Sequence, residues 1–170
     1  MSTAYQVVWE KFCQLWQIEM RTVPITHKHP TLDIEEALKM CDENTICIVP
    51  IAGVTWTGMN DDIEGLNDAL EDFNARTGYD IPIHVDAASG GFILPFLNPD
   101  KKWDFRLKWV YSISTSGHKY GLVYPGLGWI IWRDRKYLPD EMSFSVNYLG
   151  ANITQVGLNF SRPAAQILAQ

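Results

Sequence analysis

The sequence predicts an α/β protein in which a mainly parallel β-sheet is flanked by helices. Segments with the apolar spacing of helices alternate with short apolar runs along the chain. Several of these runs are rich in β-branched residues, which is typical of strands buried on both faces. Thr55, Asp86 and Lys119 each stand just past such a run. Because ligands of parallel sheets bind at the carboxyl ends of strands, we expect these three residues to converge.

The first part of the chain is expected to form two helices and two strands. Apolar residues recur with a helical period over residues 4–16, and residues 18–25 alternate as a strand does. Asp33 is a suitable cap for a short helix over 34–41, whose first turn carries two glutamates where the helix dipole favours them. The continuous β-branched run 45–51 predicts a buried strand.

The second part predicts a longer helix, three strands and a terminal helix. Residues 60–76 have helical spacing, and Gly78 is placed to cap the helix at its carboxyl end. Pro163 is typical of a helix start and opens the last helix. The strands are expected at 81–85, 109–114 and 128–132. This alternation favours a layered sheet with mainly parallel strands.

Composition limits the classes of function. The chain has 170 residues, enough for one domain with a core, and a net charge of −6 without a basic stripe, so nucleic acid is not an expected partner. It has no apolar run of about 18 residues, so no membrane partner is expected either. Three cysteines without a CxxC pair, and a start that lacks the features of a secretory signal, favour a cytoplasmic location.

One lysine and one aspartate carry the most specific chemical signal. Lys119 follows the run 109–113 within STSGHKYG, and Asp86 follows the run 81–85 within HVDAASGG. This pairing indicates a pyridoxal phosphate site, where the lysine holds the aldehyde as a Schiff base and the acid holds the protonated pyridine nitrogen. Taken singly, Lys119 is equally compatible with a solvated turn lysine, and Asp86 with a helix cap or a structural ion pair.

The neighbours of this pair suggest further roles. The small residues 87–91 are expected to let a flat ring approach the backbone closely. His118 stands beside the lysine and is a candidate donor to a phosphate or a substrate carboxylate. Ser116 is either a phosphate ligand or a turn residue. His84 shares a strand face with Asp86, and we expect it to be structural and to orient that acid. No metal site is expected.

The chain resembles the glutamate decarboxylases, which are pyridoxal phosphate-dependent group II decarboxylases. The similarity runs from about residue 6 to residue 170 and is to the large-domain half of the bacterial, plant and fungal enzymes. The stretches that carry it are DENTICIVPIAGVTWTG, HVDAASGGFILPFLNPDKKWDFRL, SISTSGHKYG, GLGWIIWR and LNFSRPAAQILAQ. The resemblance implies a fold-type I enzyme that converts L-glutamate to 4-aminobutanoate and carbon dioxide with pyridoxal 5'-phosphate as cofactor.

The resemblance also assigns roles to the motif residues. Lys119 matches the Schiff-base lysine, and Asp86 matches the acid on the pyridine nitrogen. His118 matches a histidine that contacts the cofactor phosphate and lies near the substrate. Lys119 or His118 would return a proton to the substrate Cα.

Four more residues match positions around the cofactor in that family. Thr55 matches a threonine near the phenolic oxygen of the ring and the departing carboxylate. Ala88 matches the small residue under the ring, and Gln6 matches a glutamine that packs over the other face. Ser161 matches a serine that reaches the phosphate of the neighbouring subunit, which implies at least a homodimer in the full-length protein.

The resemblance covers only part of the family's length. We therefore expect residues 1–170 to be a partial pyridoxal phosphate-binding large domain that lacks the N-terminal segment and the small C-terminal domain. Two alternatives stay open. One is a decarboxylase of another amino acid on the same fold. The other is a non-catalytic fragment that associates with full-length subunits, which the apolar terminal segment 164–169 favours.

Overall fold

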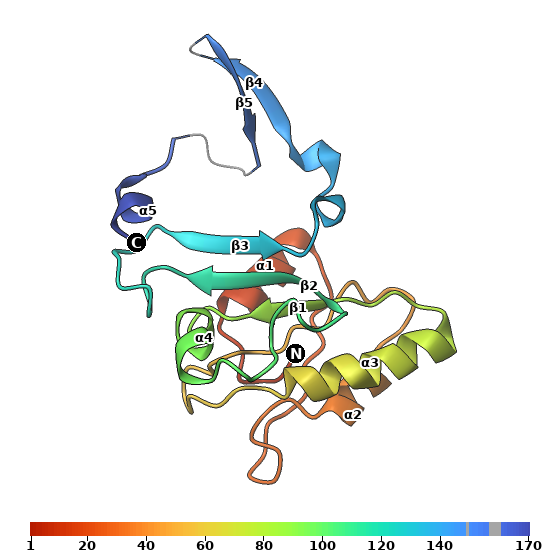
Figure 1. Cartoon of the computed structure of the whole chain (residues 1–170). Coiled ribbons are helices and arrows are strands. Elements are labelled where there is room, and N and C mark those ends of the chain that lie inside the picture. Colours follow the sequence, from red (N-terminus) through yellow and green to blue (C-terminus); the bar gives the residue numbers. More distant parts are fainter. Residues whose placement is uncertain (149, 157–160) are drawn as a thin grey trace.

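The computed structural model describes residues 1–148, 150–156 and 161–170 (Figure 1). The α-helices are α1 (Val8–Trp16), α2 (Ile34–Lys39), α3 (Ile63–Thr77), α4 (Leu94–Leu97) and α5 (Ala165–Ala169). The strands are β1 (Ile83–Asp86), β2 (Val110–Ser116), β3 (Gly128–Trp132), β4 (Phe144–Tyr148) and β5 (Ala151–Gln155). Three short 3₁₀ turns lie at Gly90–Phe92, Arg135–Tyr137 and Asp140–Met142.

The central sheet has the strand order β1-β2-β3, and β4 and β5 form a separate hairpin (Figure 1). β1 is parallel to β2, with Asp86 opposite Ser114. β2 is antiparallel to β3, with Ser116 opposite Gly128. The connection 117–127 contains no helix, and a parallel crossover needs a dozen or more residues, so β3 returns antiparallel. A further extended segment pairs parallel with β1, so the sheet is mixed, and the predicted α/β class with helices flanking the sheet is confirmed.

That further segment is the run 45–51, which was expected to be a regular strand and is not one. It forms only isolated bridges to β1. The amide of Ile48 donates to Pro82 at 3.0 Å, and the Ala52 amide donates to Asp86 at 2.9 Å. Between them stands Pro50, which accepts from the Asp86 amide but has no N–H of its own to donate. The missing donor interrupts the ladder, as is usual for proline at a sheet edge.

The predicted strand at 18–25 is wrong. Within it, only Val23 forms a bridge, to Ser2 near the start of the chain. Its amide donates to the Met1 carbonyl at 2.9 Å and its carbonyl accepts from the Thr3 amide at 2.8 Å. The partner segment near the start of the chain is therefore too short to extend this bridge into a strand.

The predicted helices are present with shifted ends. Asp33 caps α2 by accepting from the Glu36 amide at 3.1 Å, and Gly78 ends α3 in the left-handed region at φ 76°. α3 begins at Ile63, later than expected, because the Asp62 side chain caps it by accepting from the Gly65 amide at 3.0 Å. The sequence analysis missed the short helix α4 and the β4–β5 hairpin.

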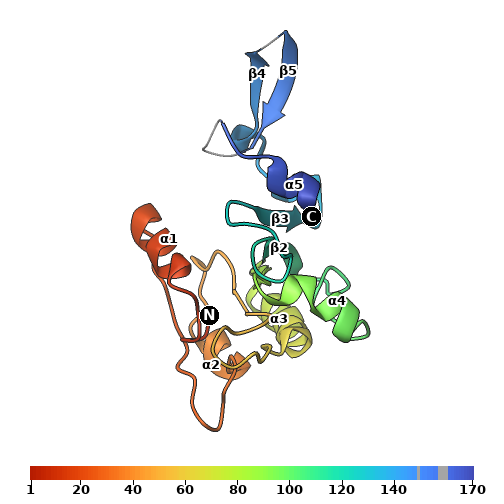
Figure 2. The same cartoon turned by 90° about the vertical axis from the view of Figure 1, so that its left-hand side faces the viewer.

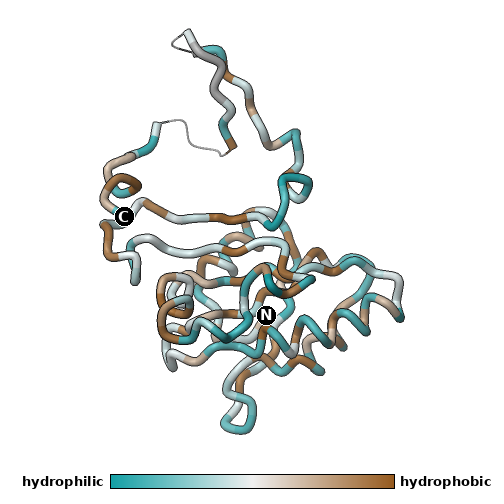
Figure 3. The backbone as a smooth tube through the Cα atoms, in the orientation of Figure 1, coloured by the Kyte–Doolittle hydropathy of each residue, from teal (hydrophilic) through white to brown (hydrophobic). Residues whose placement is uncertain are grey.

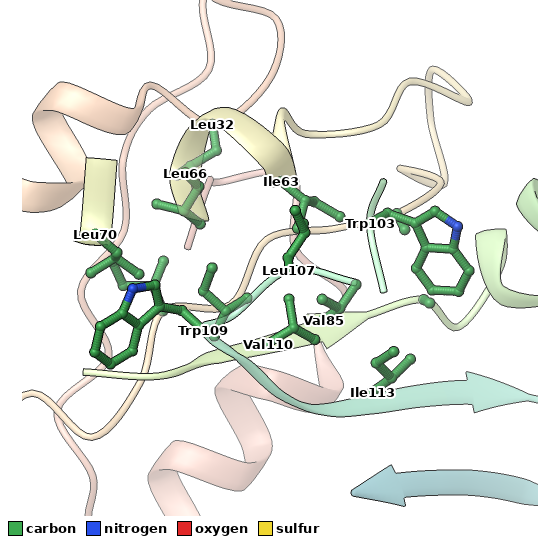
Figure 4. Close-up of a cluster of buried hydrophobic side chains, with 14 of the residues drawn as sticks. Leu32, Ile63, Leu66, Leu70, Val85, Trp103, Leu107, Trp109, Val110 and Ile113 are labelled. Atoms are coloured by element: carbon green, nitrogen blue, oxygen red, sulfur yellow. The ribbon is translucent and has the colours of Figure 1, made fainter. Parts of the chain in front are cut away.

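The hydrophobic core lies between α3 and one face of the sheet (Figure 4). Leu66 and Leu70 of α3 are completely buried, as are Val85 of β1 and Val110 of β2. The register of the β1–β2 pair shifts between Ile83 and His84. Trp103, Leu107 and Trp109 fill the remainder of this layer. Burying a side chain of this size contributes roughly 1.5–3 kcal/mol, so this layer is a main source of stability.

The other face of the sheet is lined differently. α1 lies on that side, opposite α4 (Figure 2). None of the described residues of α1 is fully buried, and Leu15 is 79% exposed. β3 is exposed along its length and carries hydrophobic residues, as the hydropathy colouring shows (Figure 3). This second face, which is not part of the main core, carries the candidate site.

Candidate functional site

Asp86 ends β1 as a buried carboxylate with two hydrogen-bond donors. Its side chain is 6% exposed. The Trp9 indole Nε1 donates to Asp86 Oδ2 at 2.7 Å, and the Ala88 amide donates to Oδ1 at 3.1 Å. Each oxygen of the carboxylate thus accepts one hydrogen bond, which fixes the orientation of the group.

His84 lies on the same face, two residues earlier on β1. Its Nδ1 is 2.7 Å from the Ser112 hydroxyl and its Nε2 is 3.1 Å from the Ser114 hydroxyl. Burial lowers the pKa of His84 from 6.5 to about 4, while the nearby Asp86 acts in the opposite direction. The imidazole is therefore neutral at physiological pH, with both ring nitrogens held by hydroxyls of β2. This is the structural role that the sequence analysis expected.

Trp9 connects this face of the sheet to α1. Its ring lies 5.4 Å from the His84 ring at an interplanar angle of 63°, an edge-to-face arrangement. The sequence analysis did not select Trp9, because it treated the helix only as an apolar stripe. The available signal was the indole N–H, which needs a hydrogen-bond partner when it is taken out of water.

Lys119 lies in the turn that follows β2, where its amide donates to the Ser116 carbonyl at 3.2 Å. Its side chain lines a pocket of about 420 Å³ together with Thr55, Ser89 and Tyr120. Among the described residues, the Lys119 amine has no hydrogen-bond partner. The structure thus brings Thr55 and Lys119 into one pocket.

Asp86 and Lys119 lie at the same edge of the sheet. β1 and β2 are parallel, and Asp86 is opposite Ser114, near the carboxyl end of β2 from which the Lys119 turn departs. Asp86 is not among the residues that line the Lys119 pocket, and within the described part of the chain no hydrogen bond or ion pair joins the two. The convergence of strand ends is confirmed, whereas the two side chains do not touch.

The other selected residues differ in their contacts and exposure. Gln6 precedes α1 and its Oε1 accepts from the Val8 amide at 2.6 Å. His118 is exposed, and Ser116 ends β2 with its amide donating to the Ala88 carbonyl at 3.2 Å. Ser161 is exposed in the segment before α5. Among the described residues, no hydrogen bond joins Ser161 to Asp86.

Two glycines among the small residues 87–91 are closely packed within the protein. A Cβ on Gly90 would lie 2.6 Å from the Ala52 carbonyl oxygen, and a Cβ on Gly91 would lie 2.5 Å from Thr115 Oγ1. Packing within the protein therefore accounts for both glycines. Ala88 and Ser89 beside them are partly exposed, and the approach of a ring to this stretch stays a prediction.

Gln170, the residue after α5, contacts the Lys119 turn, and the sequence analysis did not predict this contact. Gln170 Nε2 donates to the Gly117 carbonyl at 3.3 Å, and Gln170 Oε1 accepts from the Trp129 indole at 2.6 Å. The side chain therefore joins the turn to β3. This contact fixes the start of the loop that presents the lysine.

Residues 1–169 match the family described as the pyridoxal-dependent decarboxylase conserved domain. The chain belongs to this family. It is 55% identical over all 170 residues to a glutamate decarboxylase beta of Listeria monocytogenes, of which it spans 37%. It is 53% identical over its whole length to a glutamate decarboxylase of Lactococcus lactis, of which it spans 36%. The chain thus spans little more than a third of these relatives.

Solved structures of the decarboxylase family and its neighbours have the same fold. A glutamate decarboxylase of Lactobacillus brevis superposes with a TM-score of 0.93 at 51% identity, covering 98% of this chain and 38% of that one. The sphingosine-1-phosphate lyase of Burkholderia pseudomallei superposes with a TM-score of 0.77 at 28% identity, covering 99% of this chain and 38% of that one. The fold is therefore that of the fold-type I pyridoxal phosphate enzymes.

The residues at the sheet edge fit the cofactor of this family, pyridoxal phosphate. An ionised carboxylate offers about four acceptor positions, and Asp86 uses two of them for Trp9 and Ala88. The remaining positions suit the cationic nitrogen of a pyridine ring, which would also balance the buried charge. Lys119 supplies a primary amine at the wall of an open pocket. Asp86 and Lys119 are thus chemically suited to hold pyridoxal phosphate.

Among the described residues, no group of three or more His, Cys, Asp or Glu side chains is arranged to hold a metal ion. In the same part of the chain, every helix is too short or too polar to cross a membrane.

Proposed function

We propose that this chain is the cofactor-binding part of a glutamate decarboxylase, which converts L-glutamate to 4-aminobutanoate and carbon dioxide. The observation that carries the proposal is the pairing of Asp86 and the Lys119 turn at the carboxyl edge of two parallel strands. The identity of 53–55% to glutamate decarboxylases over the whole chain supports the substrate. Since the chain spans 36–37% of those relatives, the activity is proposed for the complete protein, with residues 1–170 as part of its large domain.

In this proposal Lys119 and Asp86 hold the cofactor. When bound, pyridoxal phosphate supplies an electron sink for the pair of electrons left behind as the carboxylate departs. Lys119 provides the amine that attaches the cofactor covalently. Asp86, ionised and buried, keeps the ring nitrogen protonated by stabilising its positive charge. Lys119 or His118 then donates a proton to the substrate Cα.

The remaining residues position the ring and the phosphate. Ala88 would lie under the ring, since its side chain is small and partly exposed beside Asp86. Gln6 would pack over the other face from the start of α1. Thr55 would face the departing carboxylate from the wall of the Lys119 pocket. Ser116 at the end of β2 would serve the phosphate.

We propose further that the complete protein is a homo-oligomer, at least a dimer, and acts in the cytoplasm. Ser161 supports an intersubunit site, because it is exposed in the segment before α5. In a dimer it would contribute to the phosphate site of the neighbouring subunit. A light-scattering mass of the complete protein tests the assembly.

A decarboxylase of another amino acid is the second candidate. The fold alone does not select the substrate, since the Burkholderia lyase, which has a different name, superposes with a TM-score of 0.77. Substrate selection therefore has to be measured directly.

The test uses the complete protein that carries these residues. Borohydride reduction in the presence of pyridoxal phosphate, followed by peptide mapping, should attach the label to Lys119. Carbon dioxide release should be greatest with L-glutamate and much smaller with aspartate or tyrosine. A label on a different lysine contradicts the assigned attachment site, and faster release from another amino acid contradicts the substrate.

A further inference from the structure

The face of the sheet beneath α1 holds a network that the proposed roles leave unused. It consists of Trp9, His84, Ser112 and Ser114 around Asp86. We propose that Trp9 is a positioning residue for Asp86, whose indole N–H holds the carboxylate in the orientation that would accept from the cofactor nitrogen. This inference rests on the proposed function, because it concerns the same acid.

The hydrogen bonds to the two oxygens of Asp86 come from different parts of the chain. The Ala88 amide belongs to the backbone just after β1, so this bond does not depend on the position of α1. The Trp9 indole comes from a helix 77 residues away, and at 2.7 Å it forms the shorter of the two bonds. With one donor on each oxygen, the plane of the carboxylate is fixed. Each oxygen keeps an acceptor position for a third donor.

The Trp9 ring is itself held in place by His84. The two rings meet edge to face at 5.4 Å, and both nitrogens of His84 are occupied by hydroxyls of β2. Phe12 of the same helix meets the Trp9 ring at 6.2 Å on another side. Because the imidazole is neutral, it does not pair with Asp86 as a competing cation. His84 therefore acts on the acid through Trp9.

Trp9 is the residue of α1 that forms a hydrogen bond with the sheet, whereas the rest of the helix is largely exposed. The helix has no fully buried residue, and its other tryptophan, Trp16, is 65% exposed. Gln6, which is proposed to pack over the ring, immediately precedes this helix. The bond from Trp9 to Asp86 thus joins the segment that carries Gln6 to the acid that would hold the cofactor nitrogen.

Removal of the indole N–H should shift the proton shared by Asp86 and the ring nitrogen toward Asp86. A donor to a carboxylate stabilises the anion, so its loss increases the attraction of that carboxylate for a proton. In the pair of Asp86 and a protonated ring nitrogen, the shared proton then moves toward the acid. The ring nitrogen becomes less protonated and the cofactor binds less tightly. A purely structural role for Trp9 would not change the protonation of the ring.

The experiment measures the ¹⁵N chemical shift of ¹⁵N-labelled pyridoxal phosphate bound to the complete protein. Trp9→Phe should move the shift toward the value of an unprotonated pyridine and weaken cofactor binding about tenfold, as expected for loss of a hydrogen bond to a charged group. Trp16→Phe is the matched control, since it makes the same change on the exposed side of the same helix. It should leave both quantities unchanged.

A second variant separates the N–H from the shape of the ring. Replacement of Trp9 by β-(3-benzothienyl)alanine keeps a bicyclic ring against His84 and substitutes sulfur for the N–H. It should reproduce the change in ¹⁵N shift even where Trp9→Phe disturbs the helix. Wild-type values in this variant would overturn the inference, as would an equal change in Trp16→Phe. A wild-type protein that binds no cofactor would instead contradict the proposed function, and the positioning role would fall with it.

Discussion

The two faces of the β1–β2 sheet carry different kinds of residue on the same strands. Toward α3, Val85 and Val110 are fully buried among leucines and tryptophans. Toward α1, His84 and Asp86 form hydrogen bonds with side chains and stand beneath a helix that has no fully buried residue. Because neighbouring residues of a strand point to opposite faces, one strand can serve the core and the site at once. Substitutions on the core face should thus change stability, and those at the site should change chemistry.

Lys119→Ala should give the largest effect on the site. Loss of the amine that attaches the cofactor is expected to lower decarboxylation by the complete protein about a thousandfold or more. Since Lys119 stands in a partly exposed turn, the free energy of unfolding should change by about 0.5 kcal/mol or less. Activity and urea unfolding of the same variant check both parts. A loss of several kcal/mol of stability would show that the turn belongs with the core.

Leu66→Ala tests the opposite face. Leu66 is completely buried between α3 and the sheet, so truncation should cost about 2–5 kcal/mol through lost burial and the cavity that remains. Leu15→Ala is the matched control, because Leu15 is a helical leucine that is 79% exposed, and it should cost about 0.5 kcal/mol or less. Urea unfolding of the complete protein measures the difference. Equal costs would contradict the assignment of the core to the α3 face.

Gly90→Ala sharpens the boundary between the two faces. The new methyl would lie 2.6 Å from the Ala52 carbonyl oxygen, so backbone must shift at a cost of about 1–3 kcal/mol. At Gly128 an added methyl meets nothing closer than 4.0 Å, which makes Gly128→Ala the control. Thermal unfolding distinguishes them. If Gly90→Ala left stability unchanged and only weakened cofactor binding, the small residues would serve the ring after all.

The smallest expected effect is the pH dependence that His84 contributes. Its pKa is about 4 in the folded protein and near 6.5 when unfolded, so the unfolded state binds the proton first as the pH falls. Stability is therefore lost from about pH 6.5 down to about pH 4, by about 1–3 kcal/mol. His84→Gln should lack this component. The free energy of unfolding is measured for the wild type and the variant at pH 7.5 and at pH 5. The difference between the two proteins should change between these pH values, and the same difference at both would contradict the prediction.

Local chemistry made several elements predictable from the sequence. The bounds 128–132 were correct for β3, and Asp33 and Gly78 act as the caps that were expected. Each of these features depends on residues a few positions apart. The run 45–51 was mistaken because its β-branched composition outweighed Pro50, whose missing N–H interrupts the pairing.

Other features depended on residues far apart in the chain. Asp86 and Lys119 could be placed at one edge because both follow strands that run in parallel. The bond from Trp9 to Asp86 could not be predicted, since nothing within 77 residues of sequence specifies it. The β4–β5 hairpin was also missed, although Gly150, at φ 78°, marked its turn.

The strand β3 has a practical consequence for work with this polypeptide. It carries the sequence Gly-Trp-Ile-Ile-Trp without a charged residue, pairs with β2 on one edge, and is exposed along its length. Uncharged apolar edge strands readily recruit further copies and precipitate. A recombinant product limited to these 170 residues should be recovered from inclusion bodies, and a charged substitution at Ile130 would be the simplest way to keep it in the supernatant.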